Sequence, residues 1–384
     1  MPDTPSRSSR RDFLKTGALA SAGLLVAQRV EAASLPSVLT SSPLTTRKPL
    51  DILILGGTGY VGPYQVRAAL ERGHRVTVFN RGQAQANLPP GVIQLRGDRS
   101  IEKLDLSALK GKKWDAAIDN SQTDQRWVTK TAELLKDSVN YYLYVSTTGV
   151  YAPYPNPGFI TEATMPRLTD NEQGETKTYG VIKALSEIEN TKVFGKRAIN
   201  VRPNFIVGPE DPKARFPYWP KRYAEGGEIL VPGTPDDHVQ FADVRDLTGF
   251  MMHLLETGTT GTFNTAGDDS ITMQKFQDAL VAAVPSANTR TWIPDVAFLR
   301  ANRVGTLIPW IAPRRTAEGV AYGQNYINSD KAVAAGLQYR PMTETIQDTL
   351  MWWNKLPESQ RATYAFGLDR TREKAALEAW RARK

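Results

Sequence analysis

Short apolar runs alternate along the chain with segments whose apolar residues recur at helical spacing. Residues 51–55 form a continuous apolar run of the kind found in strands that are buried on both faces of a parallel sheet. A helical pattern follows through Val66, Ala69 and Leu70 and ends at Gly73, a C-cap residue. Further strands are expected at residues 75–79, 92–98, 114–119 and 142–145. This alternation predicts a doubly wound α/β fold, a Rossmann-type parallel sheet with helices on both faces.

A glycine-rich turn joins the first expected strand to the first expected helix. Glycines let the backbone turn tightly and approach a pyrophosphate, whose charge the free N–H groups of the helix N-terminus then stabilise. The strand-turn-helix context therefore predicts a dinucleotide-binding turn. Its residues are Gly56, Gly57, Thr58, Gly59, Tyr60, Val61 and Gly62.

The end of the second expected strand bears on the choice between NAD and NADP. The dinucleotide fingerprint places an Asp or Glu there to bind the ribose 2′-hydroxyl, but this chain has Asn80 and Arg81. No carboxylate repels a phosphate at this position, and a guanidinium matches a phosphate in charge and geometry. We expect these two residues to bind the cofactor, with NADP preferred and NAD possible. The alternative is that Arg81 is a solvent-facing loop residue.

Two later motifs bring hydroxyl groups and a lysine toward the same edge of the sheet. The strand at 142–145 leads into Thr147 at its carboxyl end, where ligands bind in such sheets. Tyr179 and Lys183 stand four residues apart, so they share one face of a helix. A nearby ammonium favours phenolate and lowers a phenol pKa that starts near ~10, which suits proton exchange with a carbonyl or hydroxyl. The alternative is that the pair only packs on the helix surface.

Taken in order, these motifs resemble the extended short-chain dehydrogenase/reductase family, also called the NAD-dependent epimerase/dehydratase family. The resemblance covers roughly residues 50 to 350. It is carried by 56–62, Asp98, 146–151, 179–183, 201–203 with 208–209, 241–246 and 261–264. It implies that Thr147 hydrogen-bonds the substrate oxygen and that Tyr179 is the general acid/base. It also implies that Lys183 tunes the tyrosine and holds the nicotinamide ribose, and that Asp98 meets the adenine amino group.

Departures from the family pattern narrow the chemistry that the resemblance implies. Members that dehydrate nucleotide sugars place Asp-Glu directly after the catalytic threonine, where this chain has Thr-Gly at 148–149. Members that bind a nucleotide diphosphate usually carry an arginine seven residues before the acid matching Asp246, where this chain has Val239. Sugar 4,6-dehydration and a UDP- or dTDP-sugar substrate are therefore not expected. Arg215 and Arg222 are both candidates to replace the missing charge.

Composition limits the remaining chemistry. The 384 residues include no cysteine and three histidines, which excludes thiolate metal sites, iron–sulfur clusters and thiol nucleophiles. We expect no metal. The formal net charge of +8 is modest for this length and requires no nucleic-acid partner.

The first 33 residues are expected to lie outside the fold. Arg10 and Arg11 precede an apolar, small-residue stretch at 17–27, followed by a small-x-small cleavage site at 30–32, which resembles a twin-arginine export signal. The stretch is too short to span a bilayer, which needs roughly 20 apolar residues. We predict recognition by the twin-arginine export machinery, no stable membrane span after cleavage, and a periplasmic or extracellular protein.

The expected organisation is a signal peptide at 1–33, a linker at 34–48, a Rossmann domain at 49–205 and a mainly substrate-binding region at 206–384. The last is partly interleaved with the Rossmann domain and ends in a helix. Its aromatic segment 216–222 either lines the substrate cleft or packs in the core.

The expected function is an exported NAD(P)-dependent oxidoreductase acting on a carbonyl or secondary alcohol of a small polar, sugar-like substrate. One alternative is an epimerase with a tightly bound, recycled cofactor. Another is a non-catalytic dinucleotide-binding or sensor module. The family resemblance also implies a homodimer.

Overall fold

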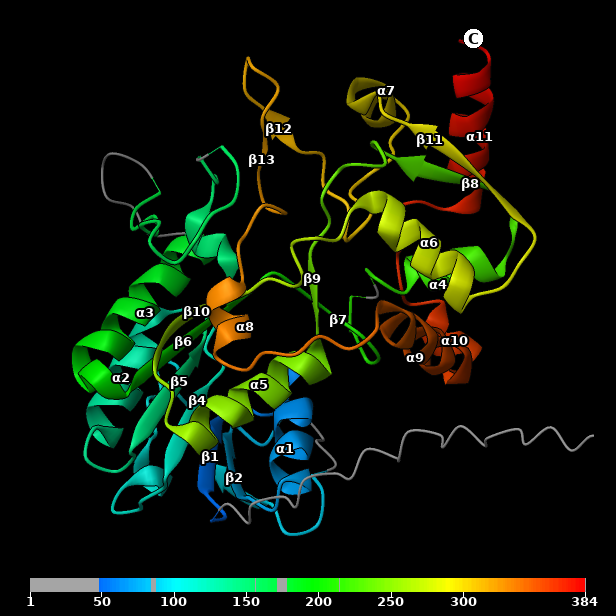
Figure 1. Ribbon diagram of the computed structural model, residues 1–384. Helices are drawn as coiled ribbons and strands as arrows, with labels where there is room; N and C mark the ends of the chain where they lie inside the picture. The colour runs from blue at the N-terminus through cyan, green and yellow to red at the C-terminus, as the bar shows by residue number, and fades with distance from the viewer. Residues whose placement is uncertain (1–47, 84–87, 156, 171–177, 214, 384) are drawn as a thin grey trace, which may run out of the picture. The chain divides into compact units, whose positions relative to one another are not determined.

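A seven-stranded parallel sheet forms the centre of the computed structural model, in the order β10-β6-β5-β4-β1-β2-β3 (Figure 1). Its strands are β1 (Asp51–Leu55), β2 (Arg75–Asn80), β3 (Ile93–Arg96), β4 (Ala116–Asp119), β5 (Tyr141–Val145), β6 (Ala198–Pro203) and β10 (Gly261–Thr265). The structure describes residues 48–83, 88–155, 157–170, 178–213 and 215–383. The expected signal peptide, and the linker up to residue 47, lie outside the described residues.

Helices cover both faces of the sheet because alternate residues of its strands point in opposite directions. On β1, Ile52 and Ile54 pack with helices α1 (Val61–Glu71) and α5 (Val244–Thr257). Leu53 and Leu55 face α2 (Gln125–Leu135) and α3 (Tyr179–Phe194) in a second apolar layer. The predicted doubly wound α/β fold is confirmed.

The third strand is shorter than its apolar run predicted. β3 ends at Arg96, and Asp98 instead forms an isolated antiparallel bridge with Asp105. A Cβ on Gly97 would lie 2.4 Å from the carbonyl oxygen of Asp105, so the chain turns back on itself at that glycine. Asp98 therefore lies on a loop beyond the strand end.

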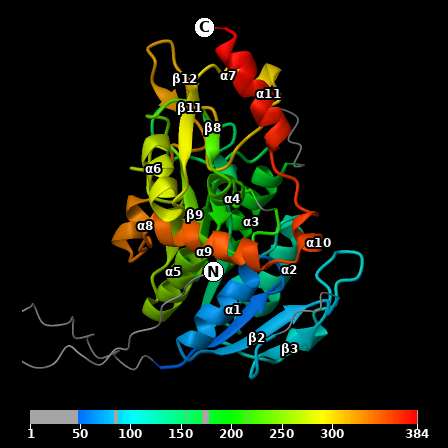
Figure 2. The same ribbon diagram turned by 90° about the vertical axis from the view of Figure 1, so that its right-hand side faces the viewer.

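A smaller region, built from segments that lie on both sides of β10 in the chain, has its own apolar core. Its elements include a parallel strand pair, β8 (Gly227–Pro232) with β11 (Asn288–Ile293). The other strand pairs are β7 (Phe205–Val207) with β9 (Phe241–Asp243), and β12 (Arg314–Arg315) with β13 (Ala321–Tyr322). Its helices are α4 (Tyr218–Ala224), α6 (Met273–Ala283), α7 (Val296–Ala301), α9 (Met342–Lys355), α10 (Glu358–Arg361) and α11 (Arg370–Arg381), the last of which contacts β8 (Figure 2). The remaining helix, α8 (Asp330–Ala334), contacts β10 of the sheet instead. Short 3₁₀ helices lie at η1 (Ser107–Leu109), η2 (Thr148–Tyr151) and η3 (Gly195–Arg197).

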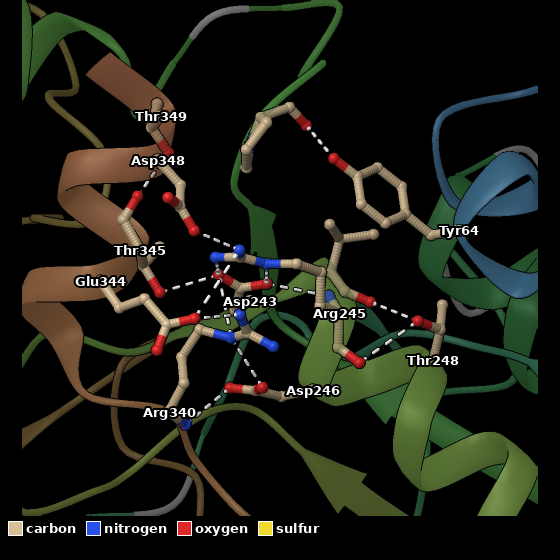
Figure 3. Close-up of polar contacts among 12 residues, drawn as sticks. Tyr64, Asp243, Arg245, Asp246, Thr248, Arg340, Glu344, Thr345, Asp348 and Thr349 are labelled. Atoms are coloured by element: carbon tan, nitrogen blue, oxygen red, sulfur yellow. Dashed lines mark hydrogen bonds and ion pairs between the residues drawn. The ribbon is translucent and has the colours of Figure 1, made fainter. Parts of the chain in front are cut away.

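Charged side chains join the start of α5 to α9 (Figure 3). Asp243 caps α5 by accepting a hydrogen bond from the N–H of Arg245 at 2.8 Å, and it also accepts from the guanidinium of Arg245 and the hydroxyl of Thr345. Arg340 donates to Asp246 from both its backbone and its guanidinium. The smaller region is thus attached to the sheet through the segment 241–246.

The described residues offer neither a membrane-spanning helix nor a cluster of metal ligands. None of their helices combines the length and the apolar character that crossing a membrane requires. Nor do these residues contain a group of three or more potential metal-ligating side chains.

Candidate active site

Each of the four glycines in the turn after β1 occupies a place that favours glycine for its own structural reason. Gly56 adopts a φ of +85°, which other residues rarely reach. A Cβ on Gly62 would lie 2.4 Å from the carbonyl carbon of Gly57, so only glycine lets α1 start directly against the turn. A Cβ on Gly59 would meet nothing within 4 Å, because the backbone there borders open space. Gly57 packs beneath the turn, where a Cβ would lie 3.1 Å from a methyl group of Val78.

A cavity of about 280 Å³ lies beside this turn at the carboxyl ends of the strands. Its lining includes Gly56, Thr58, Asn80, Arg81, Asp98, Arg99, Asn120, Gln122 and Trp127. The side-chain oxygen of Asn80 accepts from the N–H of Gly82 at 2.8 Å, while the side-chain nitrogen is buried without a hydrogen-bond partner among the described residues. Arg81 is exposed at the rim. The cavity therefore places the predicted adenosine-binding residues together and leaves polar groups free for a ligand.

Asp98 is held as an acceptor at the edge of this cavity. Its carboxylate accepts a hydrogen bond from the backbone N–H of Ser100 at 2.9 Å, and this bond lowers the pKa of Asp98. An ionised carboxylate accepts hydrogen bonds and cannot donate them. This matches the predicted contact with the amino group of an adenine.

A second cavity of about 680 Å³ contains all three predicted catalytic residues in its lining, Thr147, Tyr179 and Lys183. It is also lined by Gly59, Tyr60, Val61 and Gly62 of the turn. The two cavities share the lining residues Gly56, Asn120 and Gln122. They therefore form one continuous cleft along the carboxyl edge of the sheet.

Lys183 is buried beneath the second cavity. Its ammonium donates to the carbonyl oxygen of Ser121 at 2.7 Å and to that of Val145. It lies 4.5 Å from the ring centre of Tyr144 and 5.7 Å from that of Tyr179. Burial lowers the pKa of Lys183 to about 7.

Tyr179 is the first residue of α3 and is 49% exposed. The sequence predicted that Lys183 would lower its pKa, but in this structure burial raises the pKa of Tyr179. Removal of the phenol from water is the cause of this rise, and the ammonium of Lys183 donates to main-chain carbonyls rather than to the phenol. A tyrosine in this state remains protonated at neutral pH.

Two close contacts fix the loop that carries Thr147. The hydroxyl oxygen of Thr147 accepts from the backbone N–H of Gly149 at 3.1 Å and caps η2, which leaves its hydrogen free to donate into the cavity. A Cβ on Gly180 would lie 2.3 Å from the carbonyl oxygen of Gly149. Glycine at 180 therefore lets the start of α3 approach this loop.

The structure separates the two arginines proposed for substrate charge. Arg222 is buried in the smaller region, where it pairs with Glu373 at 2.7 Å. Arg215 lines the second cavity together with Lys213. Its Nε atom is buried, has no hydrogen-bond partner among the described residues and lies 3.7 Å from Asp211.

The aromatic segment 216–222 packs in the core rather than lining this cavity. Phe216 and Trp219 are fully buried among the apolar side chains of the smaller region. Of the two roles left open by the sequence, the structure supports packing.

Arg99 is a cleft residue that the sequence did not identify. It lines the first cavity and is 8% exposed. Its one signal in the sequence is its position directly after Asp98, and no spacing rule distinguishes it from other loop arginines.

The parallel sheet, the glycine turn and the cleft define an α/β protein with a Rossmann-type dinucleotide site. The profile of the "NAD dependent epimerase/dehydratase family" matches residues 52–266, more than half of the chain. The chain belongs to this family of enzymes.

Individual relatives are distant. The chain is 25% identical over 248 residues to "Chloroplast stem-loop binding protein of 41 kDa b, chloroplastic" of Arabidopsis thaliana, a match covering 60% of this chain and 62% of that protein. It thus spans less than two thirds of that relative's length. It is 24% identical over 266 residues to a dTDP-4-dehydro-6-deoxy-D-allose reductase of a Streptomyces species, covering 61% of this chain and 81% of the relative.

Among solved structures, the UDP-glucuronic acid 4-epimerase of Bacillus cereus in complex with NAD superposes with a TM-score of 0.57 at 16% identity. That match covers 80% of this chain and 97% of the neighbour. At this identity the likeness shows the fold. The predictions of family and of an enzyme are confirmed, whereas the roles of single residues, the preference for NADP, the homodimer and export stay predictions.

Proposed function

We propose that this chain is an exported, NADP-dependent oxidoreductase that reduces a carbonyl, or oxidises a secondary alcohol, on a small polar substrate. The observation that carries the proposal is the single cleft, in which Thr147, Tyr179 and Lys183 continue into the cavity beside the glycine turn. The match to a reductase over 81% of that relative's length also supports it.

The residues present fit a nicotinamide dinucleotide, which when bound supplies or accepts the hydride. The turn at 56–62 offers a backbone that borders open space at Gly59. The unpartnered side-chain nitrogen of Asn80 and the guanidinium of Arg81 are donors that support binding of a 2′-phosphate, with Asp98 nearby as an acceptor for adenine. Lys183 holds the nicotinamide ribose in this assignment.

Proton transfer falls to Tyr179 and orientation to Thr147. Because burial raises its pKa, Tyr179 carries its proton at neutral pH and is suited to donate it to a carbonyl oxygen. The free hydroxyl hydrogen of Thr147 donates to the same oxygen and stabilises the charge that develops there. This arrangement favours carbonyl reduction near neutral pH.

An epimerase is the second candidate function. The neighbour in complex with NAD is a sugar 4-epimerase of the same fold. Export adds weight, because a protein outside the cytoplasm has no obvious pool of free dinucleotide and is best served by a cofactor that is retained and regenerated. Stoichiometric dinucleotide kept through dialysis would favour this candidate.

The first experiment isolates the native protein from the periplasmic fraction, denatures it and identifies any released dinucleotide by mass. NADPH and NADH are then titrated, and NADPH oxidation is followed with a panel of carbonyl compounds. We expect Tyr179→Phe to keep dinucleotide affinity and to lower turnover by about 10²–10⁴-fold. Tyr364→Phe, in the smaller region, is the control and should match the native protein.

Several outcomes would contradict the proposal. A native protein that binds neither dinucleotide would remove the enzyme functions. Undiminished turnover in Tyr179→Phe would remove the assigned proton donor. Dinucleotide binding with no turnover on any substrate, and an unchanged biological role for Tyr179→Phe, would favour the non-catalytic module.

A further inference from the structure

Arg99 forms a buried ion pair on the floor of the cavity beside the glycine turn. One guanidinium nitrogen, Nη1, lies 2.7 Å from Oδ1 of Asp119, the last residue of β4. The side chain of Asp119 is completely buried. The guanidinium carbon also lies 5.7 Å from the ring centre of Trp127, on α2.

The carboxylate of Asp119 is fully engaged by its neighbours. Besides Arg99, the hydroxyl and backbone N–H of Ser121 donate to Oδ1 at 2.6 and 2.8 Å, and the hydroxyl of Tyr142 donates to Oδ2 at 2.6 Å. Burial alone would raise the pKa of Asp119, but the charge of Arg99 and these hydrogen bonds hold it below its usual value. The carboxylate therefore stays ionised at neutral pH and fixes the guanidinium in one orientation.

Arg99 lines the cavity, and its N–H groups other than those on Nη1 do not contact Asp119. Within the described part of the chain, the guanidinium has no hydrogen-bond acceptor other than Asp119. A Cβ on Gly56 would lie 3.7 Å from Nη2 of Arg99, so this nitrogen lies next to the glycine turn. Arg81 stands at the rim of the same cavity.

Stability does not account for this pair. Removing two charges from water costs about as much as their attraction returns, so apolar side chains would fill the same space equally well. A guanidinium that is fixed by one carboxylate and keeps a fork of free donors matches the geometry of an oxyanion. The feature that needs explaining is the set of donors at the border of an accessible cavity.

We propose that Arg99 binds a phosphate group of the dinucleotide from the floor of the cavity. The inference rests on the proposed function for the identity of the ligand. Its chemistry is common to the pyrophosphate, which NAD and NADP share, and to the 2′-phosphate of NADP. Arg99 thereby acts with Arg81 to set the affinity of the cavity for the phosphate groups of the dinucleotide.

Fragments of the cofactor test this role without turnover. Calorimetric titrations at low ionic strength compare adenosine, ADP and 2′-AMP on the full-length native protein and on Arg99→Met. We expect the native protein to bind a phosphorylated fragment more tightly than adenosine, and Arg99→Met to lose about 10–100-fold of that affinity with adenosine unchanged. Loss confined to ADP identifies the pyrophosphate, and loss confined to 2′-AMP identifies the 2′-phosphate.

Because Arg99→Met leaves a buried carboxylate without its counter-ion, the double variant Arg99→Met/Asp119→Asn is measured beside it. Arg126→Met is the matched control, since Arg126 pairs with Asp124 and is 57% exposed outside the cavity. Native affinities in folded Arg99→Met or in the folded double variant would overturn the inference. So would a native protein that binds no fragment.

The same titrations separate this inference from the proposed function. Arg99-dependent binding of ADP, together with no binding of NADPH or NADH, would support the phosphate site and contradict the oxidoreductase. If both dinucleotides bind and Arg99→Met does not change their affinity, the oxidoreductase proposal is supported and the phosphate site at Arg99 is contradicted.

Discussion

The sheet region and the smaller region each bury an arginine against a carboxylate, yet the two arginines differ in how many guanidinium nitrogens have an acceptor. Arg222 uses all three guanidinium nitrogens: Nε pairs with Glu373 at 2.7 Å, and the other two donate to the carbonyl oxygens of Gly226 and Glu228. Arg99 uses only Nη1, toward Asp119.

The difference lies in what surrounds each pair. Glu373 comes from α11 and also accepts from the backbone N–H of Leu230 in β8 at 3.0 Å, so the Arg222 pair attaches the C-terminal helix to the smaller region. Arg99 borders a cavity and keeps donors for a ligand. Of two pairs of the same chemistry, one thus attaches a helix and the other keeps donors for a ligand, and the unsatisfied donors distinguish them.

The largest expected effect concerns the pair of Arg222 and Glu373, in which every guanidinium nitrogen has an acceptor. Glu373→Gln leaves the buried charge of Arg222 without its partner, and we expect the free energy of unfolding to fall by about 3–5 kcal/mol. Urea titration followed by circular dichroism measures it. Affinity for ADP in the folded fraction should not change.

The control for that variant is Glu378→Gln on the same helix, where the side chain is 57% exposed and lies 3.9 Å from Lys374. It should change stability by less than about 0.5 kcal/mol. If both variants were equally stable, the Arg222 pair would not be the structural contact described.

A smaller effect is expected from Lys183, a third buried cation. Because its pKa is about 7 when folded and 10.5 when unfolded, the unfolded chain binds more protons between these values, and stability rises with pH. Above the unfolded pKa the amine is neutral in both states, so its burial carries no charge penalty. The penalty grows as pH falls and reaches its full size below the folded pKa. From about pH 7 to about pH 9 we expect the native protein to gain roughly 2–3 kcal/mol relative to Lys183→Met.

The measurement is urea unfolding of both proteins at several pH values. Lys192→Met, on the same helix and 71% exposed, should keep the native pH dependence. Parallel curves for the native protein and Lys183→Met would mean that Lys183 stays charged when folded.

The smallest expected effect sharpens the contrast between glycines at the cleft and glycines elsewhere. In Gly180→Ala the new Cβ would lie 2.3 Å from the carbonyl oxygen of Gly149, and we expect a loss of about 1–3 kcal/mol. In Gly249→Ala on α5 the nearest atom lies 3.7 Å away, so the better helix propensity of alanine should raise stability by up to ~1 kcal/mol. Thermal unfolding compares them, and equal shifts in the same direction would contradict the close approach at Gly180.

Features coded by neighbouring residues were predicted well. The strands at 51–55 and 142–145 and the turn at 56–62 follow from a local apolar run or a local glycine pattern. The predicted strand at 92–98 was too long, because Gly97 packs against Asp105, a contact that no local pattern reveals. The predicted fall in the pKa of Tyr179 was wrong because desolvation, which depends on the surrounding tertiary structure, raises that pKa.

The sequence by itself determined the fold class and family, and it assigned the expected catalytic and cofactor residues to the edge of the sheet where the cleft lies. Only the tertiary structure decided which arginines face that cleft: Arg99 and Arg215 border cavities, whereas Arg222 is enclosed. The physical reason is that an arginine's role depends on which acceptors reach it. The partner of Arg99 is 20 residues away and that of Arg222 is 151 residues away, distances at which a sequence pattern carries no information about contact.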